Sequence, residues 1–115
     1  MSEFFYTLPD HNRAASYRNF RITPACGALG ADLEDVDLTR SGSDAFHELR
    51  QALLAHKVLF IRNQSLSVGD LETVTRQFGE FGREPYVNGM ADHPHVVRGI
   101  KEANETAPFV FGGAW

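Results

Sequence analysis

The feature that most constrains the fold is a short apolar run between two segments with helical periodicity. The run, Val58-Leu59-Phe60-Ile61, contains no polar residue, which is typical of a central strand buried on both faces. On each side of it, apolar residues recur at the i, i+3, i+7 spacing of an amphipathic helix. These positions are Phe46, Leu49, Leu53 and Leu71, Val74, Phe78. The order of helix, buried strand and helix over residues 43–79 predicts an α+β fold with two helices packed on a sheet.

Polar residues indicate where these helices begin and end. Ser43 is expected to cap the first helix, with Asp44 in its first turn, where the helix dipole favours an anion. Ser67 is expected to cap the second helix, with Asp70 as the acid of a capping box. Gly79 is expected to end that second helix.

Two short strands are expected before the first helix. Arg21-Ile22-Thr23-Pro24 predicts a strand halted by proline. In residues 31–38, the alternation at Val36 and Leu38 suits a half-buried edge strand whose acidic residues face water. A calcium loop is the alternative for Asp35 and Asp37, but the central glycine and closing glutamate of such loops are missing.

Composition limits the class of protein. Apolar residues make up 43% of the chain and charged residues 23%, with a net charge of −4 and no basic cluster, so nucleic-acid binding is not indicated. The chain has neither a membrane-length apolar run nor a secretory signal pattern, which predicts a cytoplasmic protein. Cys26, the single cysteine, is interpreted as a small core residue. No feature indicates an oligomeric state.

The histidines and the N-terminus suggest little chemistry. Residues 1–20 are interpreted as an N-terminal arm, with polar residues 10–13 as a loop or mobile segment. His47 and His56 are expected at the surface or at a helix end. Residues 95–100 predict a strand, and Pro94 in Asp92-His93-Pro94-His95 suggests a turn that leads into it. A metal site at Asp92, His93 and His95 is the minor alternative, since His93 and His95 would point to one side of an extended segment.

The last residues, Phe109-Val110-Phe111-Gly112-Gly113-Ala114-Trp115, combine an apolar run with two glycines. They are interpreted as a buried strand and a bend. Because chain ends are normally polar, this end is interpreted as a cut through a packed structure.

The ordered set of motifs resembles the taurine dioxygenase (TauD/TfdA) family over about residues 20–115. The motifs are Ile22-Thr23-Pro24 with Gly27, Gly30-Ala31-Asp32-Leu33, Val36-Asp37-Leu38, the helix that follows, residues 56–64, and Gln77-Phe78-Gly79-Glu80. The resemblance implies a double-stranded β-helix (jelly-roll) dioxygenase that uses Fe(II) and 2-oxoglutarate to hydroxylate a small organic substrate. The iron would be held by two histidines and a carboxylate.

The resemblance also implies that this chain stops short of the iron site. In the family, the first two ligands form a His-x-Asp or His-x-Glu motif that often follows a tryptophan, and Trp115 is the last residue. No histidine of the chain begins such a motif. We therefore expect residues 21–115 to be the N-terminal part of such a domain, truncated before the metal motif and inactive as given. No catalytic or metal-binding residue is assigned.

Only a substrate-contacting segment is carried over from the family. The loop after the Phe-Gly-Glu segment helps to wall the substrate pocket, and the corresponding residues are Tyr86, Val87 and Asn88. Gly112-Gly113-Ala114 stands where a polar residue often precedes the tryptophan. The alternative function is a short non-catalytic α+β binding or interaction module that is complete at Trp115.

Overall fold

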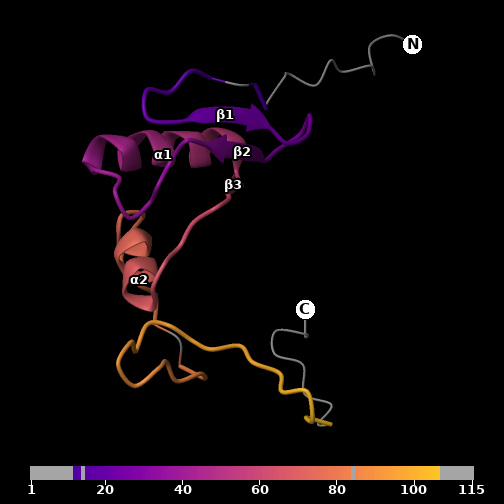
Figure 1. Ribbon diagram of the computed structural model, residues 1–115, viewed down its shortest axis with the longest axis vertical. Helices are drawn as coiled ribbons and strands as arrows, with labels where there is room; N and C mark the ends of the chain where they lie inside the picture. Colours follow the sequence, from indigo (N-terminus) through magenta and orange to yellow (C-terminus); the bar gives the residue numbers. More distant parts are fainter. Residues whose placement is uncertain (1–11, 14, 84, 107–115) are drawn as a thin grey trace. The chain divides into compact units, whose positions relative to one another are not determined.

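The computed structural model describes residues 12, 13, 15–83 and 85–106. The chain divides after Glu80 into two compact units, which are treated separately. The helices and strands of the described residues all lie in the first unit. In chain order they are β1 (Arg21–Pro24), β2 (Ala31–Glu34), α1 (Ser43–His56), β3 (Leu59–Ile61) and α2 (Val68–Arg76) (Figure 1).

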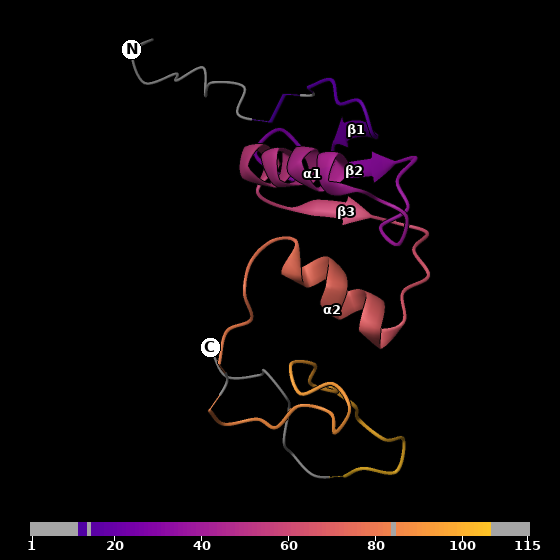
Figure 2. The ribbon, with the colours of Figure 1, turned by 90° about the vertical axis from the view of Figure 1, so that its left-hand side faces the viewer.

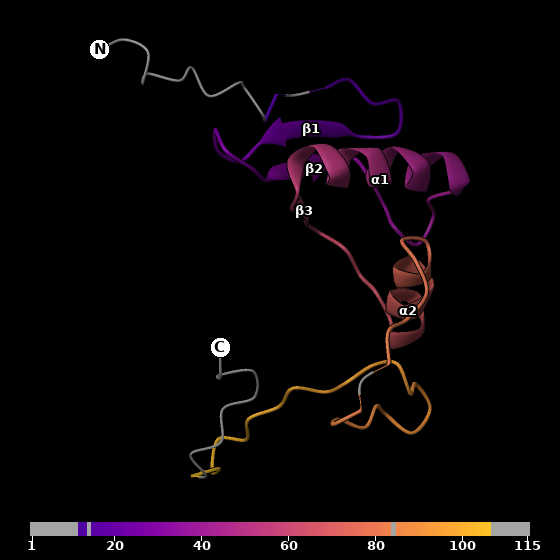
Figure 3. The ribbon, with the colours of Figure 1, turned by 180° about the vertical axis from the view of Figure 1, so that it is seen from behind.

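The three strands form one sheet in the order β1-β2-β3. β2 pairs antiparallel with β1 and parallel with β3, so β2 is the central strand. A parallel pair needs a crossover connection, and α1 supplies it. The helix extends alongside the strands (Figure 2), and Figure 3 shows the same layers from behind.

Side chains alternate between the two faces of this sheet. On β2, Ala31 and Leu33 are buried, whereas Asp32 and Glu34 point to the other face. The register places Leu33 between Ile22 of β1 and Ile61 of β3, so the apolar residues of the three strands share one face. α1 covers that face.

The core forms between this face and α1. The helix buries one stripe, which consists of Ala45, Phe46, Leu49, Ala52 and His56. Leu49 is fully buried, and it belongs to the same cluster as Phe20, Ala31 and Leu33. The helix confirms the predicted apolar face, but its N-cap is Gly42. The prediction that Ser43 caps the helix is therefore wrong, because the extended residue lies one position earlier.

The second helix begins as expected. The hydroxyl of Ser67 accepts a hydrogen bond from Asp70 N (3.0 Å), and Ser67 N donates to Asp70 Oδ2 (2.9 Å), which completes the capping box. The helix ends at Arg76, three residues before Gly79, so the predicted end is wrong. Phe78 follows the last turn and meets Phe46 in a T-shaped, edge-to-face contact, with 6.2 Å between ring centroids.

Two strand predictions need correction. β3 forms, but it lies at the edge of the described sheet and Phe60 is 44% exposed, so the strand is not buried on both faces. The covering helix lies on one face only, which leaves the other face of β3 open. The strand expected at Val36 and Leu38 is absent among the described residues, because β2 ends at Glu34 and Asp35 takes a left-handed conformation (φ 63°).

Residues before β1 take part in the first unit. Asn12 and Phe20 are buried, and the rings of Tyr17 and Phe20 stack with 4.8 Å between centroids. The carboxylate of Glu48 on α1 accepts hydrogen bonds from the backbone N–H groups of Arg18 and Asn19, both at 2.9 Å. The described part of the predicted arm is therefore tied to the helix and the core.

The Glu48 contacts predict an acid-sensitive attachment. The backbone hydrogen bond from Arg18 is the largest cause that lowers the pKa of Glu48 below its ordinary value of 4.5. A carboxyl group with a lowered pKa stabilises the fold above its unfolded-state pKa, and this stabilisation is lost as the pH falls through the folded-state pKa. Urea unfolding of Glu48→Gln at pH 7 and pH 3 should therefore show a smaller loss of stability on acidification than the original chain. An equal loss in both proteins would contradict this role for Glu48.

The second unit contains no helix or strand among its described residues. The strand predicted over 95–100 is therefore wrong for this structure. Backbone hydrogen bonds that close turns order the segment instead: Val96 N donates to His93 O (2.9 Å). The predicted apolar strand and bend at 109–115 lie outside the described residues.

Candidate functional site

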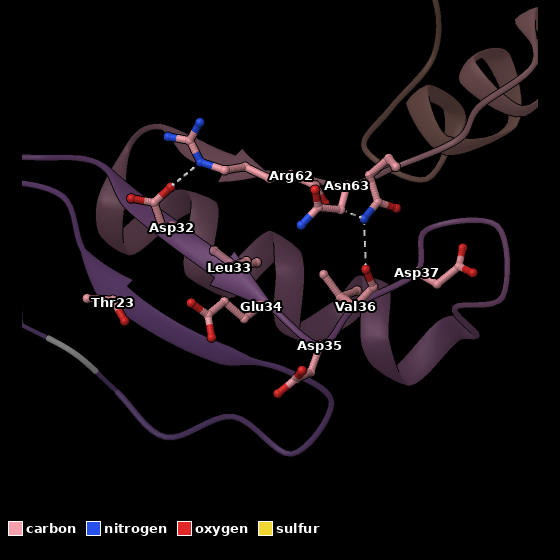
Figure 4. Close-up of a pocket in the computed structure, with 10 residues that line it drawn as sticks. Thr23, Asp32, Leu33, Glu34, Asp35, Val36, Asp37, Arg62 and Asn63 are labelled. Carbon is pink, nitrogen blue, oxygen red and sulfur yellow. Dashed lines mark hydrogen bonds and ion pairs between the residues drawn. The ribbon is translucent and has the colours of Figure 1, made fainter.

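A groove of the first unit lies where the parallel strands β2 and β3 end. Ligands of open sheets commonly bind at the carboxyl ends of parallel strands. The groove has a volume of about 760 Å³ and is shown in Figure 4. It is lined by Thr23, Asp32, Leu33, Glu34, Asp35, Val36, Asp37, Arg62, Asn63 and Gln64.

Ion pairs join many of the charged residues in and beside this groove. Arg62 Nε lies 3.0 Å from Asp32 Oδ1, and Figure 4 shows the two side chains directed toward each other. Arg21 on β1 pairs with both Glu34 (2.9 Å) and Asp35 (2.6 Å). These side chains are largely exposed, so each pair contributes little to stability. The carboxylates are already engaged with cations of the same chain.

The rest of the groove is held by hydrogen bonds. Gln64 Nε2 donates to Val36 O (2.8 Å), and its Oε1 accepts from Leu38 N (2.9 Å), so this side chain ties the loop after β2 to the segment after β3. The hydroxyl and backbone N–H of Thr39 hydrogen-bond to Asp37 and lower the pKa of that carboxyl group. Asp37 thus shapes the turn after β2, and its exposed side chain agrees with the prediction that the acidic residues of this segment face water.

The residues predicted to contact substrate belong to the second unit. Tyr86, Val87 and Asn88 are all exposed; the Tyr86 side chain reaches 92% exposure. They occupy consecutive positions in a segment that belongs to no helix or strand. An exposed aromatic ring beside an amide group can contact both apolar and polar parts of a small molecule.

The structure does not assemble the alternative metal site. No group of three His, Cys, Asp or Glu side chains among residues 12, 13, 15–83 and 85–106 is arranged to hold a metal ion. The imidazole of His95 instead stacks on Phe81, with 4.4 Å between ring centroids and 6° between ring planes. Asp92, His93 and His95 therefore do not converge on one point.

The sequence interpretation missed a buried polar pair. His56 is 1% exposed, although we expected it at the surface or at a helix end. It does end α1, and its Nδ1 lies 2.5 Å from Oδ1 of Asn12, which is also buried. Helical spacing could have revealed this, because His56 lies seven positions after Leu49 on the buried stripe.

Cys26 is another residue whose environment differs from the prediction. It is exposed, not a core residue. Hydrogen bonds with the backbone of Leu29 and Ala28 lower the pKa of its thiol. The buried partner at this loop is Asn12, whose amide group donates to the carbonyl oxygens of Cys26 and Gly30.

Comparison with known proteins identifies the family. Residues 19–111 match the family model described as "Taurine catabolism dioxygenase TauD, TfdA family". The chain belongs to the TauD/TfdA family. The match includes the groove, residues 86–88 and the Phe81–His95 stack, and it confirms the resemblance drawn from the sequence motifs.

A solved structure supports the TauD/TfdA assignment. It is the crystal structure of a protein from Burkholderia xenovorans assigned as an alpha-ketoglutarate-dependent taurine dioxygenase. The two chains share 32% sequence identity with a TM-score of 0.59. The match covers 65% of this chain and 28% of that one. The described α+β unit thus resembles a part of a TauD/TfdA dioxygenase. None of the described helices is long and apolar enough to cross a membrane.

Proposed function

We propose that this chain is the N-terminal part of a non-haem Fe(II)/2-oxoglutarate-dependent dioxygenase of the jelly-roll type, which hydroxylates a small organic substrate. The observation that carries the proposal is the family match over residues 19–111, combined with coverage of only 28% of the solved relative. In this proposal the described sheet and helices form the N-terminal part of the catalytic domain, and the enzyme works in the cytoplasm.

The described residues do not fit the iron that the family implies. Such a site needs two imidazoles and a carboxylate on one face of the metal. The described residues contain no group of three potential ligands, and His95 is engaged with Phe81. We therefore assign none of the described residues to iron or 2-oxoglutarate, and we propose that the chain by itself is inactive.

Within the proposed enzyme, this chain contributes Tyr86, Val87 and Asn88 to the substrate pocket. All three side chains are exposed in the described structure. The groove at the ends of β2 and β3 is a weaker candidate, because its carboxylates are paired with Arg21 and Arg62.

Turnover of 2-oxoglutarate tests the proposal. The purified chain, supplied with Fe(II), 2-oxoglutarate and dioxygen, should form no succinate above a control without protein. A longer form that continues through a His-x-Asp or His-x-Glu motif and the rest of the domain should form succinate. Succinate production by the 115-residue chain would show that it is not an inactive part, and its absence in the longer form would contradict the dioxygenase assignment.

A further inference from the structure

The segment that carries Tyr86, Val87 and Asn88 has no regular secondary structure to hold it. Its described neighbours between Phe81 and residue 100 form neither helix nor strand. A segment of this kind keeps one conformation only if side-chain packing or backbone contacts order it. The structure shows one such contact between residues on the two sides of the segment and one between residues that follow it.

The first contact is the stack of Phe81 and His95. The rings are nearly parallel, at 6°, and their centroids are 4.4 Å apart. This contact joins residues on opposite sides of the 86–88 segment and closes it into a loop. Stacking needs only a flat ring at position 95, whereas metal binding or proton transfer would need the imidazole nitrogens.

The second contact is the approach of Gly89 to Pro94. A Cβ atom built on Gly89 would overlap the backbone O and C atoms of Pro94. Both are backbone atoms, so no side-chain rotation could relieve the overlap. Glycine is thus the residue that fits at position 89, directly after Asn88.

Backbone hydrogen bonds complete this arrangement. Met90 N donates to Val96 O (2.8 Å), and Val96 N donates to His93 O (2.9 Å). His93 N also donates to Met90 O (3.2 Å). The chain from Gly89 to Val96 therefore folds back on itself beside the Phe81–His95 stack.

From these contacts we propose that His95 and Gly89 are positioning residues, which hold Tyr86, Val87 and Asn88 as a preformed wall for substrate. His95 acts through the flat face of its ring, and Gly89 acts through its lack of a side chain. Preforming the loop lowers the entropy that substrate binding would otherwise lose in ordering it. That Tyr86, Val87 and Asn88 contact substrate rests on the proposed function, whereas the ordering of their loop does not.

Amide hydrogen exchange in the 15N-labelled chain tests this proposal. In His95→Ala, the Met90 and Val96 amides should exchange about two- to twelve-fold faster, the range expected from loss of one aromatic stacking contact. The backbone amides of Tyr86 and Val87 should gain mobility in relaxation measurements. His95→Phe keeps a flat ring and should restore exchange to within about twofold of the original chain. His47→Ala, an exposed histidine on α1, is the matched control and should change none of these amides.

Position 89 is tested by a second pair of variants. Gly89→Ala should accelerate exchange of the Met90 and Val96 amides, because its Cβ displaces Pro94. Gly82→Ala has no atom within 4 Å of the added Cβ and should leave the exchange unchanged. Amides of α1 report whether the first unit still folds in each variant, so that a change confined to the second unit can be assigned to the loop.

The possible outcomes separate this inference from the proposed function. Unchanged exchange in His95→Ala would overturn the inference, and so would His95→Phe behaving like His95→Ala, since the imidazole would then be needed for its nitrogens. Failure of a longer form to consume 2-oxoglutarate would remove the proposed function and leave these exchange results standing.

Discussion

Leu49→Ala should lower the free energy of unfolding by about 2–5 kcal/mol, the range for removing a buried leucine side chain. Leu49 is fully buried on α1, in the cluster that includes Ala31 and Leu33 of β2. Truncation leaves a cavity between helix and sheet that the neighbouring side chains only partly fill. Urea unfolding, followed by circular dichroism of the helices, measures the change.

Leu54→Ala is the matched control for this experiment. Leu54 lies on the same helix but is 66% exposed. Its truncation should change stability by no more than about 0.5 kcal/mol, as for most surface substitutions. Similar losses for the two variants would contradict the placement of the core between α1 and one face of the sheet.

Asn12→Ala should have the second large effect, lowering the free energy of unfolding by about 2 kcal/mol or more. Its side chain donates to Gly30 O (2.8 Å) and to Cys26 O, and it accepts from His56 Nδ1 (2.5 Å). The two carbonyl contacts fix the amide nitrogen on that side, so His56 carries its proton on Nδ1. Removing the amide leaves buried donors and acceptors without partners.

Two measurements check the Asn12 prediction. Urea unfolding should show the loss for Asn12→Ala and a change of no more than about 0.5 kcal/mol for Asn104→Ala, an exposed asparagine in the second unit. The 15N chemical shifts of the His56 ring should report a proton on Nδ1 in the original chain. If Asn12→Ala were as stable as the original chain, residue 12 would behave as the loop or mobile segment predicted from the sequence.

Local sequence patterns predicted several elements well, because short-range interactions determine them. The strand at Arg21–Pro24 and the capping box of Ser67 and Asp70 each involve residues within a few positions of one another. Helical spacing placed Leu49 correctly on a buried face. The ordered motifs were also sufficient for the family, which the match over residues 19–111 confirms.

Features that depend on distant parts of the chain could not be predicted in this way. The run at β3 is apolar, but its burial depends on which strands and helices cover it, and Phe60 remains exposed. Alternation at Val36 and Leu38 suggested a strand, whereas the left-handed Asp35 ends β2 before them. The role of Asn12 depends on carbonyl groups of the loop before β2, which local patterns do not reveal.

In the candidate site, too, some features could be predicted from the sequence and others depend on contacts that local patterns do not reveal. Family motifs alone pointed to Tyr86, Val87 and Asn88, and their substrate contacts stay a proposal. The contacts that order their loop, between Phe81 and His95 and between Gly89 and Pro94, join residues that no local pattern pairs. The spacing of His93 and His95 suggested a metal site. In the structure, the ring of His95 stacks on Phe81 instead.

The most direct test of the central claim is the genomic sequence that follows the codon for Trp115. If this chain is the N-terminal part of a TauD/TfdA dioxygenase, the reading frame should continue at once into His-x-Asp or His-x-Glu, the first two iron ligands of the family. A stop codon directly after Trp115 would contradict the claim, and the non-catalytic binding module would then be the better account of this chain.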